Sequence, residues 1–372
     1  MTPSYFPIVG GTETHVKYLA SALKTRSIEC EVVTFCDTKK WEPSKRFKQK
    51  VLDDTRVSVW PSFPVGKPSH LTKVHFVAST PFKLRDYMNK ADILHFHDDA
   101  DLSFPLMLSR VDKPRIFSCH CLAYNWTFYA KQPLARRLFT GSADLFHVFS
   151  RRDAVNLERL GVAEDRIRII PTSMPPGMEA SRVSEDRSKS SRDTVRIVWV
   201  GRIDRAKGLI VLLQAANLLK NDFRNFELLI GGKVWDAAYY RELLDYKAAA
   251  NLEEAHFIGF VSDLQSFLLD ADIFALPSLM EVGPATVLEA MGCGLPVVGS
   301  DVGAVPDDIV DNETGFLVPP GNPVALATKL RLLVSDEKLR IRMGRKARER
   351  AMSQFSYNRM FSMVLDMYRE LV

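Results

Sequence analysis

The sequence of 372 residues lacks any uninterrupted apolar run near the roughly 18 residues that a membrane span requires. Its start, Met1-Thr2-Pro3-Ser4-Tyr5, does not read as a basic stretch followed by the apolar core of a secretory signal. The hydrophobic residues, 46% of the chain, are instead spread along it in short segments, as in a globular protein. We therefore predict a cytoplasmic protein.

Cysteine is also scarce. The five cysteines are scattered, and mostly within apolar runs, at Cys30, Cys36, Cys119, Cys121 and Cys293. An odd, dispersed set predicts buried thiols rather than disulfides. Cys119-His120-Cys121 brings metal-ligand types together, but neighbouring strand residues point to opposite faces. We therefore predict no metal site at these three residues.

No nucleic-acid motif accompanies the net charge of +5, so we expect no nucleic-acid partner. The basic excess belongs to residues 1–176, with 26 Lys and Arg against 18 Asp and Glu, whereas the remainder has 24 against 27. Its densest run is Lys39, Lys40, Lys45, Arg46, Lys48 and Lys50. Such a run forms either solvated loops or a contact surface for anionic lipid headgroups or an acidic acceptor.

Strand-like and helix-like segments alternate, which predicts parallel sheets with crossover helices. The length suits two such α/β domains. The strand-like runs of the first are 31–36, 57–60, 93–96, 115–118, 145–149 and 168–170, and those of the second are 195–200, 226–230, 256–258, 272–276, 297–299 and 315–318.

A polar, Ser-rich stretch without apolar periodicity marks the linker between the domains. We expect domains over 1–175 and 195–355, a linker over 176–194 and a final helix over 356–372. That helix carries one apolar stripe, which predicts core or interdomain packing, and we expect the C-terminal helices to pack back toward the N-terminal domain.

A glycine pair, Gly10-Gly11, precedes an amphipathic run with Val16, Leu19 and Leu23 on one face. This predicts a glycine loop that opens a helix. Such a loop normally follows a buried strand, yet only nine residues precede it. Since loss of a central strand would expose pairing groups on both neighbours, we predict that the true start lies upstream of Met1.

Two glutamates, Glu281 and Glu289, flank a junction between an apolar strand-like run ending at Pro277 and a helical run over 285–291. At the carboxyl edge of an α/β sheet, such a junction faces a ligand crevice, and the helix directs its positive end into it. Two carboxylates beside an anion site suit a molecule with hydroxyls on both sides of a phosphate, such as a sugar nucleotide. On spacing alone, a solvated loop acid and an ordinary helix glutamate explain the stretch equally well.

A second chemical stretch follows the first strand of the second domain. Arg202 is able to fork onto two phosphate oxygens, and Lys207 adds a point charge. The pair suits a diphosphate without any metal; the alternative is two solvated loop cations.

Histidines end two strands of the first domain. His95 and His97 share a strand face next to Asp98, which permits a hydrogen-bonded polar cluster or a metal site. His120 lies at the carboxyl end of the next strand, where such domains bind ligands, and is either a functional residue or a satisfied buried histidine.

Taken together, these segments resemble the family 4 retaining glycosyltransferases, which have two facing Rossmann-like domains in the GT-B arrangement. The matching segments run nearly end to end: Gly10-Gly11-Thr-Glu-Thr-His-Val, Gly201-Arg202 to Lys207-Gly208, Glu281 to Glu289-Ala-Met-Gly-Cys-Gly, and Asn312-Glu313-Thr-Gly-Phe-Leu-Val.

The resemblance implies transfer of a sugar from a nucleoside diphosphate sugar to an acceptor hydroxyl, with retention at the anomeric carbon and no cofactor. The acceptor would belong to glycan, polysaccharide or glycolipid synthesis, with the enzyme in the cytoplasm or peripheral at the inner membrane face. The catalytic set implied is His120, Arg202, Lys207 and Glu281. The implied donor-binding set is Gly10, Gly11, Arg202, Lys207, Ile258, Val282, Gly283, Pro284, Thr286, Val287 and Glu289.

Within these sets, Arg202 and Lys207 would bind the diphosphate, with a backbone N–H of Gly11. Glu281 would hold sugar hydroxyls, Glu289 the ribose, and His120 would face the transferred sugar. The base would lie near Phe257 to Phe260, a stretch that includes Ile258.

The chain also departs from the family pattern at Pro284-Ala285, at Gly303 to Asp307 and at Ile170 to Met174. The first two departures bear on sugar specificity. Alternatives are an epimerase or phosphorylase of the same architecture, or a non-catalytic nucleotide-sugar binding protein.

Overall fold

The computed structural model describes residues 11–34, 48–52, 55–59, 85, 88–97, 111–120, 128–178 and 193–372. The chain divides into two units, Met1–Pro171 with Met360–Val372, and Thr172–Arg359. Gly10, the nine residues before it and most of the predicted linker lie outside the described residues. Among the residues described, no helix combines the length and the apolar character needed to cross a bilayer.

The carboxyl-terminal unit is built on six parallel strands, as the alternating pattern predicts. Their order is β10-β9-β8-β11-β12-β13. In chain order the strands are β8 (Val195–Val200), β9 (Phe226–Gly231), β10 (Ala255–Gly259), β11 (Ile273–Leu276), β12 (Val297–Ser300) and β13 (Gly315–Val318). The chain reverses its direction of travel across the sheet between β8 and β11, which is where α/β sheets of this kind bind ligands.

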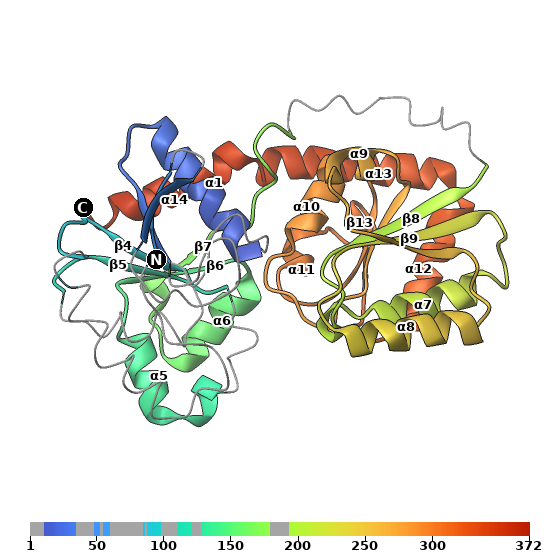
Figure 1. Ribbon diagram of the computed structural model, residues 1–372, viewed down its shortest axis with the longest axis horizontal. Coiled ribbons are helices and arrows are strands. Elements are labelled where there is room, and N and C mark those ends of the chain that lie inside the picture. Colours follow the sequence, from blue (N-terminus) through green and yellow to red (C-terminus); the bar gives the residue numbers. More distant parts are fainter. Residues whose placement is uncertain are drawn as a thin grey trace. The chain divides into compact units, whose positions relative to one another are not determined.

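Helices cover both faces of this sheet, with α7 and α8 on one side and α9, α10 and α13 on the other (Figure 1). Within β8, Ile197 and Trp199 join one buried cluster while Val198 joins the other, so alternate side chains supply two cores. The helices are α7 (Leu209–Leu219), α8 (Ala237–Ala249), α9 (Leu264–Leu269), α10 (Ala285–Gly292), α11 (Val305–Asp308), α12 (Pro323–Ser335) and α13 (Glu337–Gln354), with the 3-10 turn η4 (Arg205–Lys207).

In the amino-terminal unit the described strands form two sheets, β1-β3-β2 and β4-β5-β6-β7. They are β1 (Glu31–Thr34), β2 (Lys48–Leu52), β3 (Thr55–Val59), β4 (Leu94–His97), β5 (Arg115–Ser118), β6 (Leu145–Val148) and β7 (Ile167–Ile169). All pairs are parallel except β2 with β3, which is antiparallel. The expectation that only parallel strands occur misses β2, because Lys-Gln-Lys-Val-Leu has little of the apolar content by which strands are recognised.

Helices α1 (Gly11–Thr25), α5 (Pro133–Thr140) and α6 (Arg151–Leu160), and the 3-10 turn η1 (Glu164–Arg166), belong to this unit. In α1 the predicted apolar face is buried. Helix α6 begins with Ser150, whose hydroxyl accepts a hydrogen bond from the Asp153 N–H, and ends at Gly161 in the left-handed conformation.

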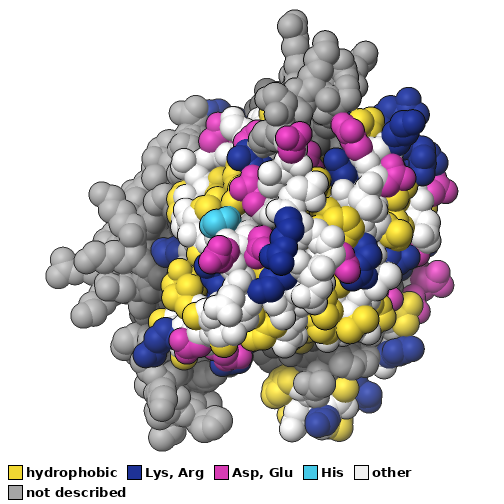
Figure 2. Space-filling model, turned by 90° about the vertical axis from the view of Figure 1, so that its right-hand side faces the viewer, with side chains coloured by type: hydrophobic (Ala, Val, Ile, Leu, Met, Phe, Trp, Pro, Cys, Tyr) yellow, Lys and Arg dark blue, Asp and Glu magenta, His cyan; other side chains and the backbone are white. Residues whose placement is uncertain are grey.

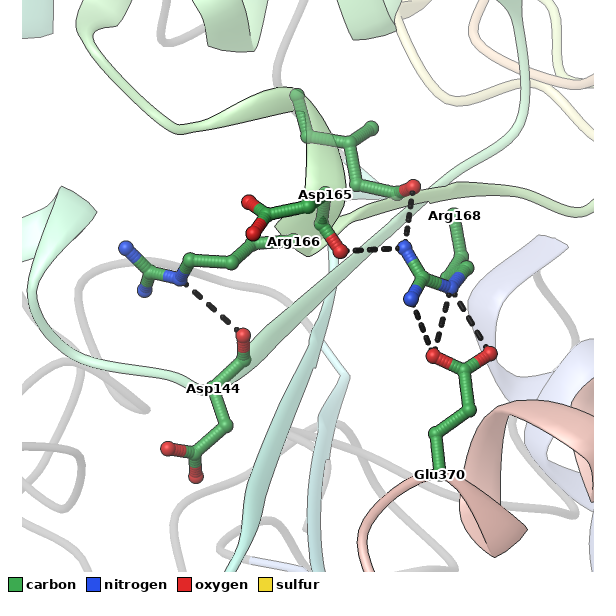
Figure 3. Close-up of polar contacts among 6 residues, drawn as sticks. Asp144, Asp165, Arg166, Arg168 and Glu370 are labelled. Atoms are coloured by element: carbon green, nitrogen blue, oxygen red, sulfur yellow. Dashed lines mark hydrogen bonds and ion pairs between the residues drawn. The ribbon is translucent and has the colours of Figure 1, made fainter.

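The last helix, α14 (Tyr357–Arg369), joins the amino-terminal unit from Met360 onward. Its stripe is buried there, with Phe361 and Val364 fully enclosed. Near its end, the Arg168 guanidinium on β7 donates hydrogen bonds to both carboxylate oxygens of Glu370 (Figure 3). These hydrogen bonds lower the pKa of the Glu370 carboxyl.

Candidate active site

Two loops meet at the point where the direction of the six-stranded sheet reverses. The loop after β8 contains Gly208, which has a positive φ of 62° and lies so close to the loop after β11 that a Cβ would sit 2.1 Å from the Pro277 carbonyl oxygen. The N–H of Leu279 donates to the carbonyl of Ala206 at 2.8 Å and joins the same loops. This contact requires a glycine, because any side chain would push the loops apart.

The close approach pairs Lys207 with Glu281. The Lys207 ammonium lies 2.7 Å from Oε1 of Glu281, and both side chains are largely buried, with 16% and 7% of their surface exposed. The Ser278 hydroxyl donates to the same Oε1 at 2.7 Å. Lys207 and Glu281 are both predicted site residues, and the fold brings them into direct contact. Since the bonds from Lys207 and Ser278 both reach Oε1, Oε2 can accept hydrogen bonds from hydroxyl groups of a ligand.

The loop after β12 supports the backbone around Glu281. Gly303 has a positive φ of 53°, and a Cβ there would lie 2.2 Å from the Glu281 carbonyl oxygen. The N–H of Ala304 donates to the Val282 carbonyl at 2.9 Å. On the other side, the Thr172 hydroxyl donates to the Gly283 carbonyl at 3.3 Å. Thus one of the predicted departures from the family pattern, at 303–307, directly contacts the segment 281–283.

Helix α10 follows this segment, and its N-terminal position, Pro284, supplies no side-chain cap. The amide groups of an uncapped first turn favour an anion. Val287, however, is fully buried, and its N–H donates to the Pro284 carbonyl at 3.0 Å. Neither its side chain nor its amide is therefore placed for donor binding, in contrast to half-buried Thr286.

Arg202 lies in the loop after β8 with 47% of its side chain exposed. Its guanidinium lies 3.6 Å from the Asp204 carboxylate and 5.3 Å from the ring centre of Trp235. A contact of 3.6 Å with a half-exposed partner is a weak restraint. Arg202 is therefore able to reach an incoming anion.

Glu289, on α10, lines a pocket of about 280 Å³. The other lining residues are Pro175, Pro176, Met178, Ser262, Asp263, Leu264 and Gln265. Burial raises the pKa of Glu289 to about 7. Its carboxyl group therefore titrates near neutral pH, in a recess large enough for a sugar ring.

The remaining predicted donor position, Ile258, lies on β10 with 43% of its surface exposed, next to exposed Phe260. These exposed apolar side chains offer a surface on which a flat ring can stack. On the face of this unit in Figure 2, acidic and basic side chains are interspersed, without one sign predominating.

In the amino-terminal unit, the carboxyl ends of β4, β5 and β6 hold a continuous chain of hydrogen bonds. The register places His97 beside Ser118 and Ser118 beside His147. His147 Nε2 donates to the Ile170 carbonyl at 2.8 Å, because a carbonyl only accepts, so His147 Nδ1 must accept from the Ser118 hydroxyl at 2.7 Å.

The same logic fixes the remaining protons. Ser118 accepts from His95 Nε2 at 2.7 Å, and His95 Nδ1 accepts from the Tyr368 hydroxyl at 2.8 Å. The predicted polar cluster thus forms around His95, and its partners are Ser118 and a tyrosine of α14. Asp98 lies outside the described residues.

His120 follows β5 and lies with its Nε2 3.1 Å from Nδ1 of His97. His15 of α1 packs edge-on against the ring of His120, with ring centres 5.3 Å apart. Burial lowers the pKa of both His97 and His120 well below the usual value, and that of His15 to about 3. These imidazoles are therefore neutral at pH 7. Gly11, at the start of α1, is exposed.

Sequence reasoning missed two residues that position others, namely Ser278 and Tyr368. Ser278 precedes Glu281 by three residues, a spacing that permits a local hydrogen bond, so a signal existed. No local pattern points to Tyr368, which meets His95 across 273 positions of sequence.

Two family models match the chain, one to each half. The model for Glycosyltransferase Family 4 matches residues 9–176, and that for Glycosyl transferases group 1 matches residues 182–350. A D-inositol 3-phosphate glycosyltransferase of Paenarthrobacter aurescens (strain TC1) is 26% identical, over 98% of this chain and 93% of its own. A phosphatidyl-myo-inositol mannosyltransferase of Mycobacterium leprae (strain TN) is 25% identical, over 98% of this chain and 94% of its own.

Among solved structures, that of Anabaena Alr3699/HepE in complex with UDP has a TM-score of 0.81 and 18% identity, covering 100% of this chain and 98% of its own. This likeness shows the GT-B fold. Together with the two family models, which leave little of the sequence unmatched, it confirms the resemblance inferred from the motifs. The chain belongs to the glycosyltransferases, with an amino-terminal half of the family 4 type and a carboxyl-terminal half of the group 1 type.

Proposed function

We propose that this glycosyltransferase takes a nucleoside diphosphate sugar as donor and transfers the sugar to an acceptor hydroxyl with retention at the anomeric carbon. The observation that carries the proposal is the buried Lys207–Glu281 pair at 2.7 Å, at the reversal point of the six-stranded sheet. A cation for phosphate and a carboxylate for hydroxyls are thereby in contact, as the junction of sugar and diphosphate requires. The related fold of Anabaena HepE was solved in complex with UDP-glucose.

In this proposal, the donor diphosphate takes Lys207 and Arg202 as its cationic partners. The bond between the anomeric carbon and the diphosphate oxygen breaks as negative charge develops on the departing group. Pre-organised cations stabilise that charge more in the transition state than in the ground state, so no metal is required at the diphosphate. Lys207 is held in place by Glu281, whereas half-exposed Arg202 moves onto the phosphate oxygens.

Glu281 then holds hydroxyls of the donor sugar through Oε2 while its Oε1 remains bound to Lys207 and Ser278. A carboxylate fixed by two donors is a positioning group, and we do not assign it the role of a covalent nucleophile. The backbone of Val282, Gly283 and Pro284 lines the same subsite.

Glu289 accepts hydrogen bonds from the ribose in its pocket, and the base lies over Ile258. From the amino-terminal unit, His120 contacts the transferred sugar and the Gly11 N–H contacts the diphosphate. As a neutral imidazole, His120 can accept or donate a hydrogen bond to a sugar hydroxyl without adding charge.

A donor screen by thermal shift tests this assignment. Nucleoside diphosphate sugars are compared with the matching nucleoside monophosphates, and ligand at 100 times its Kd is expected to stabilise by about 2.7 kcal/mol. Arg202→Ala should lose the advantage of the diphosphate. Arg331→Ala, which removes a half-exposed ion pair with Asp222 in the same unit, is the matched control. Equal shifts of the thermal midpoint with nucleoside monophosphates and nucleoside diphosphate sugars would contradict the proposed diphosphate site.

Retention is tested on the donor that the screen identifies. Slow hydrolysis without acceptor should first release sugar with the donor's own anomeric configuration, as followed by proton NMR before mutarotation. Initial release of the opposite anomer would show inversion.

We further propose an acceptor from glycan, polysaccharide or glycolipid synthesis, used by a cytoplasmic enzyme that binds peripherally to the inner membrane face. The support is the basic excess of residues 1–176. Flotation with liposomes should show binding that increases with anionic lipid and decreases with salt. Binding that does not depend on anionic lipid would contradict the membrane proposal and leave the donor site untouched.

A further inference from the structure

Five of the chain's eight histidines gather at one place in the amino-terminal unit, at the carboxyl ends of β4 to β6 and on α1. They are His15, His95, His97, His120 and His147, and their rings lie in a connected series of contacts. Hydrogen bonding divides them into two groups. Both ring nitrogens of His95 and of His147 are engaged in the chain from Tyr368 to Ile170. These two histidines have no nitrogen to offer a ligand.

The other three differ. His97 and His120 share one hydrogen bond of 3.1 Å, and Nε2 of His15 is buried without a hydrogen-bond partner among the described residues. His15 itself is only 7% exposed. One ring nitrogen from each of the three lies within 4.8 Å of the other two. A buried ring nitrogen that meets no described hydrogen-bond partner, beside two other imidazoles, is placed to bind a ligand.

We propose that His15, His97 and His120 bind a transition-metal ion of the zinc class. Tetrahedral zinc with Zn–N distances of about 2.0–2.1 Å places its imidazole nitrogens about 3.4 Å apart. The 3.1 Å spacing of His97 Nδ1 and His120 Nε2 already approaches this value. A rotation of the His15 ring closes the remaining distance. Three imidazoles leave the fourth position open for water or a substrate oxygen.

The protonation states favour such a site. Burial lowers the pKa of each of the three imidazoles, as do the neighbouring rings. The bond between His97 and His120 holds one proton, which the metal displaces to another ring nitrogen.

The three ligands come from α1, from the end of β4 and from the turn after β5, so only the folded unit presents them together. The site is independent of Lys207 and Arg202, which lie in the other unit. It shares His120 with the proposed sugar contact, and only in that respect rests on the proposed function. A metal bound to His120 therefore blocks that contact and inhibits transfer.

Metal binding is measured without donor, on the full chain free of any histidine tag and treated with chelator. Zn²⁺ is titrated in competition with a chromophoric chelator, and Co²⁺ is followed by its visible absorption. We expect one equivalent of Zn²⁺ and a tetrahedral Co²⁺ spectrum. His15→Ala and His97→Gln should each weaken binding by more than the roughly 10–100-fold that loss of an outer partner costs. The matched control is His256→Ala, which removes an exposed histidine of the other unit.

Circular dichroism and the thermal midpoint establish that the variants fold, and His15→Gln replaces His15→Ala if the latter does not. Absence of stoichiometric binding, equal affinity in His15 variants and the parent, or an octahedral Co²⁺ spectrum would each overturn the metal site. Because donor is absent, none of these results depends on whether the transfer mechanism is right.

Discussion

The two α/β units carry opposite kinds of chemistry at equivalent places, namely at the carboxyl ends of their parallel strands. These places are the ends of β8 and β11 in the carboxyl-terminal unit and the ends of β4 to β6 in the amino-terminal unit. The carboxyl-terminal unit buries charge there, as the pair of Lys207 with Glu281. The amino-terminal unit buries neutral imidazoles whose pKa values burial has lowered. A buried charge persists where an opposite charge touches it, and a titratable group without one becomes neutral. The difference teaches that buried charge is kept in one unit by an opposite charge in direct contact, whereas the buried imidazoles of the other unit are kept neutral.

Removing the charge from the charged site should have the largest effect. Lys207→Ala is expected to lower kcat/KM, with a loss of transition-state stabilisation of about 2–4 kcal/mol, because a pre-organised partner of the leaving diphosphate is lost. Steady-state kinetics with the identified donor measure it. Lys346→Ala, which removes an exposed pair with Glu313 at 3.2 Å, should stay within about 0.5 kcal/mol. Equal turnover in parent and Lys207→Ala would mean that the two sites differ in burial but not in role.

The neutral site is tested next, through its hydrogen-bond chain. Tyr368→Phe leaves the buried Nδ1 of His95 without its donor, which should reduce the stability of β4 to β6 by about 1–3 kcal/mol. Amide hydrogen exchange of peptides covering these strands reports on this unit alone. Tyr246→Phe is the control, because the structure gives the Tyr246 hydroxyl no hydrogen bond to any described residue. Unchanged protection in Tyr368→Phe would show that the chain of hydrogen bonds contributes nothing measurable.

Glu289 provides a third test, since its carboxyl is partly buried and forms no ion pair with any residue that the structure describes. Its folded-state pKa of about 7 lies above the ordinary 4.5, so the folded protein keeps a proton that the unfolded chain has released. Stability conferred by that proton is present at low pH and declines as the pH rises through 7. As the pH rises from 5 to 8, the thermal midpoint of the parent should therefore fall relative to that of Glu289→Gln, which has no carboxyl group to titrate.

Donor affinity should move in the opposite direction, because ribose hydroxyls donate to the ionised form. We expect it to increase by at most about tenfold per pH unit and to lose this dependence in Glu289→Gln. Glu313→Gln, an exposed site, controls for general pH effects. If the difference in donor affinity between the parent and Glu289→Gln did not change with pH, the carboxyl group would be in contact with water and not buried.

The smallest effect belongs to an ion pair outside both sites. Glu370→Gln weakens the grip of Arg168 on α14, and both side chains are partly exposed, at 30% and 40%. We expect a loss of about 0.2–1 kcal/mol that shrinks as salt is added. Hydrogen exchange of α14 at two salt concentrations measures it. A larger, salt-independent loss would make this pair comparable to the buried Lys207–Glu281 pair.

Most of the charged site could be predicted from the sequence. Its residues lie in short loops that follow recognisable strands, so local pattern alone places Lys207 and Glu281 after strands of the same sheet. Missing from that prediction was their mutual contact, which depends on the close approach at Gly208, and the burial of Val287. Glycine contacts of this kind depend on atomic spacing that a pattern of residue types does not contain.

The neutral site was harder to predict. His95, His97 and His120 were visible as polar residues at strand ends, but His15 is one residue of an amphipathic helix, and Tyr368 belongs to the far end of the chain. Which ring nitrogen carries a proton follows only from three-dimensional partners, as with the Ile170 carbonyl that fixes His147. The two-domain fold, by contrast, follows from periodicity alone, apart from antiparallel β2.

The return of α14 to the amino-terminal unit also bears on how the protein is made. Residues 172–359 form a unit that is complete once they have left the ribosome. The other unit still lacks residues 360–372, which include buried Phe361 and Tyr368, whose hydroxyl donates a hydrogen bond to His95. Synthesis therefore begins with the unit that is finished last, and a nascent chain stalled before Met360 should contain one folded unit, the second in sequence.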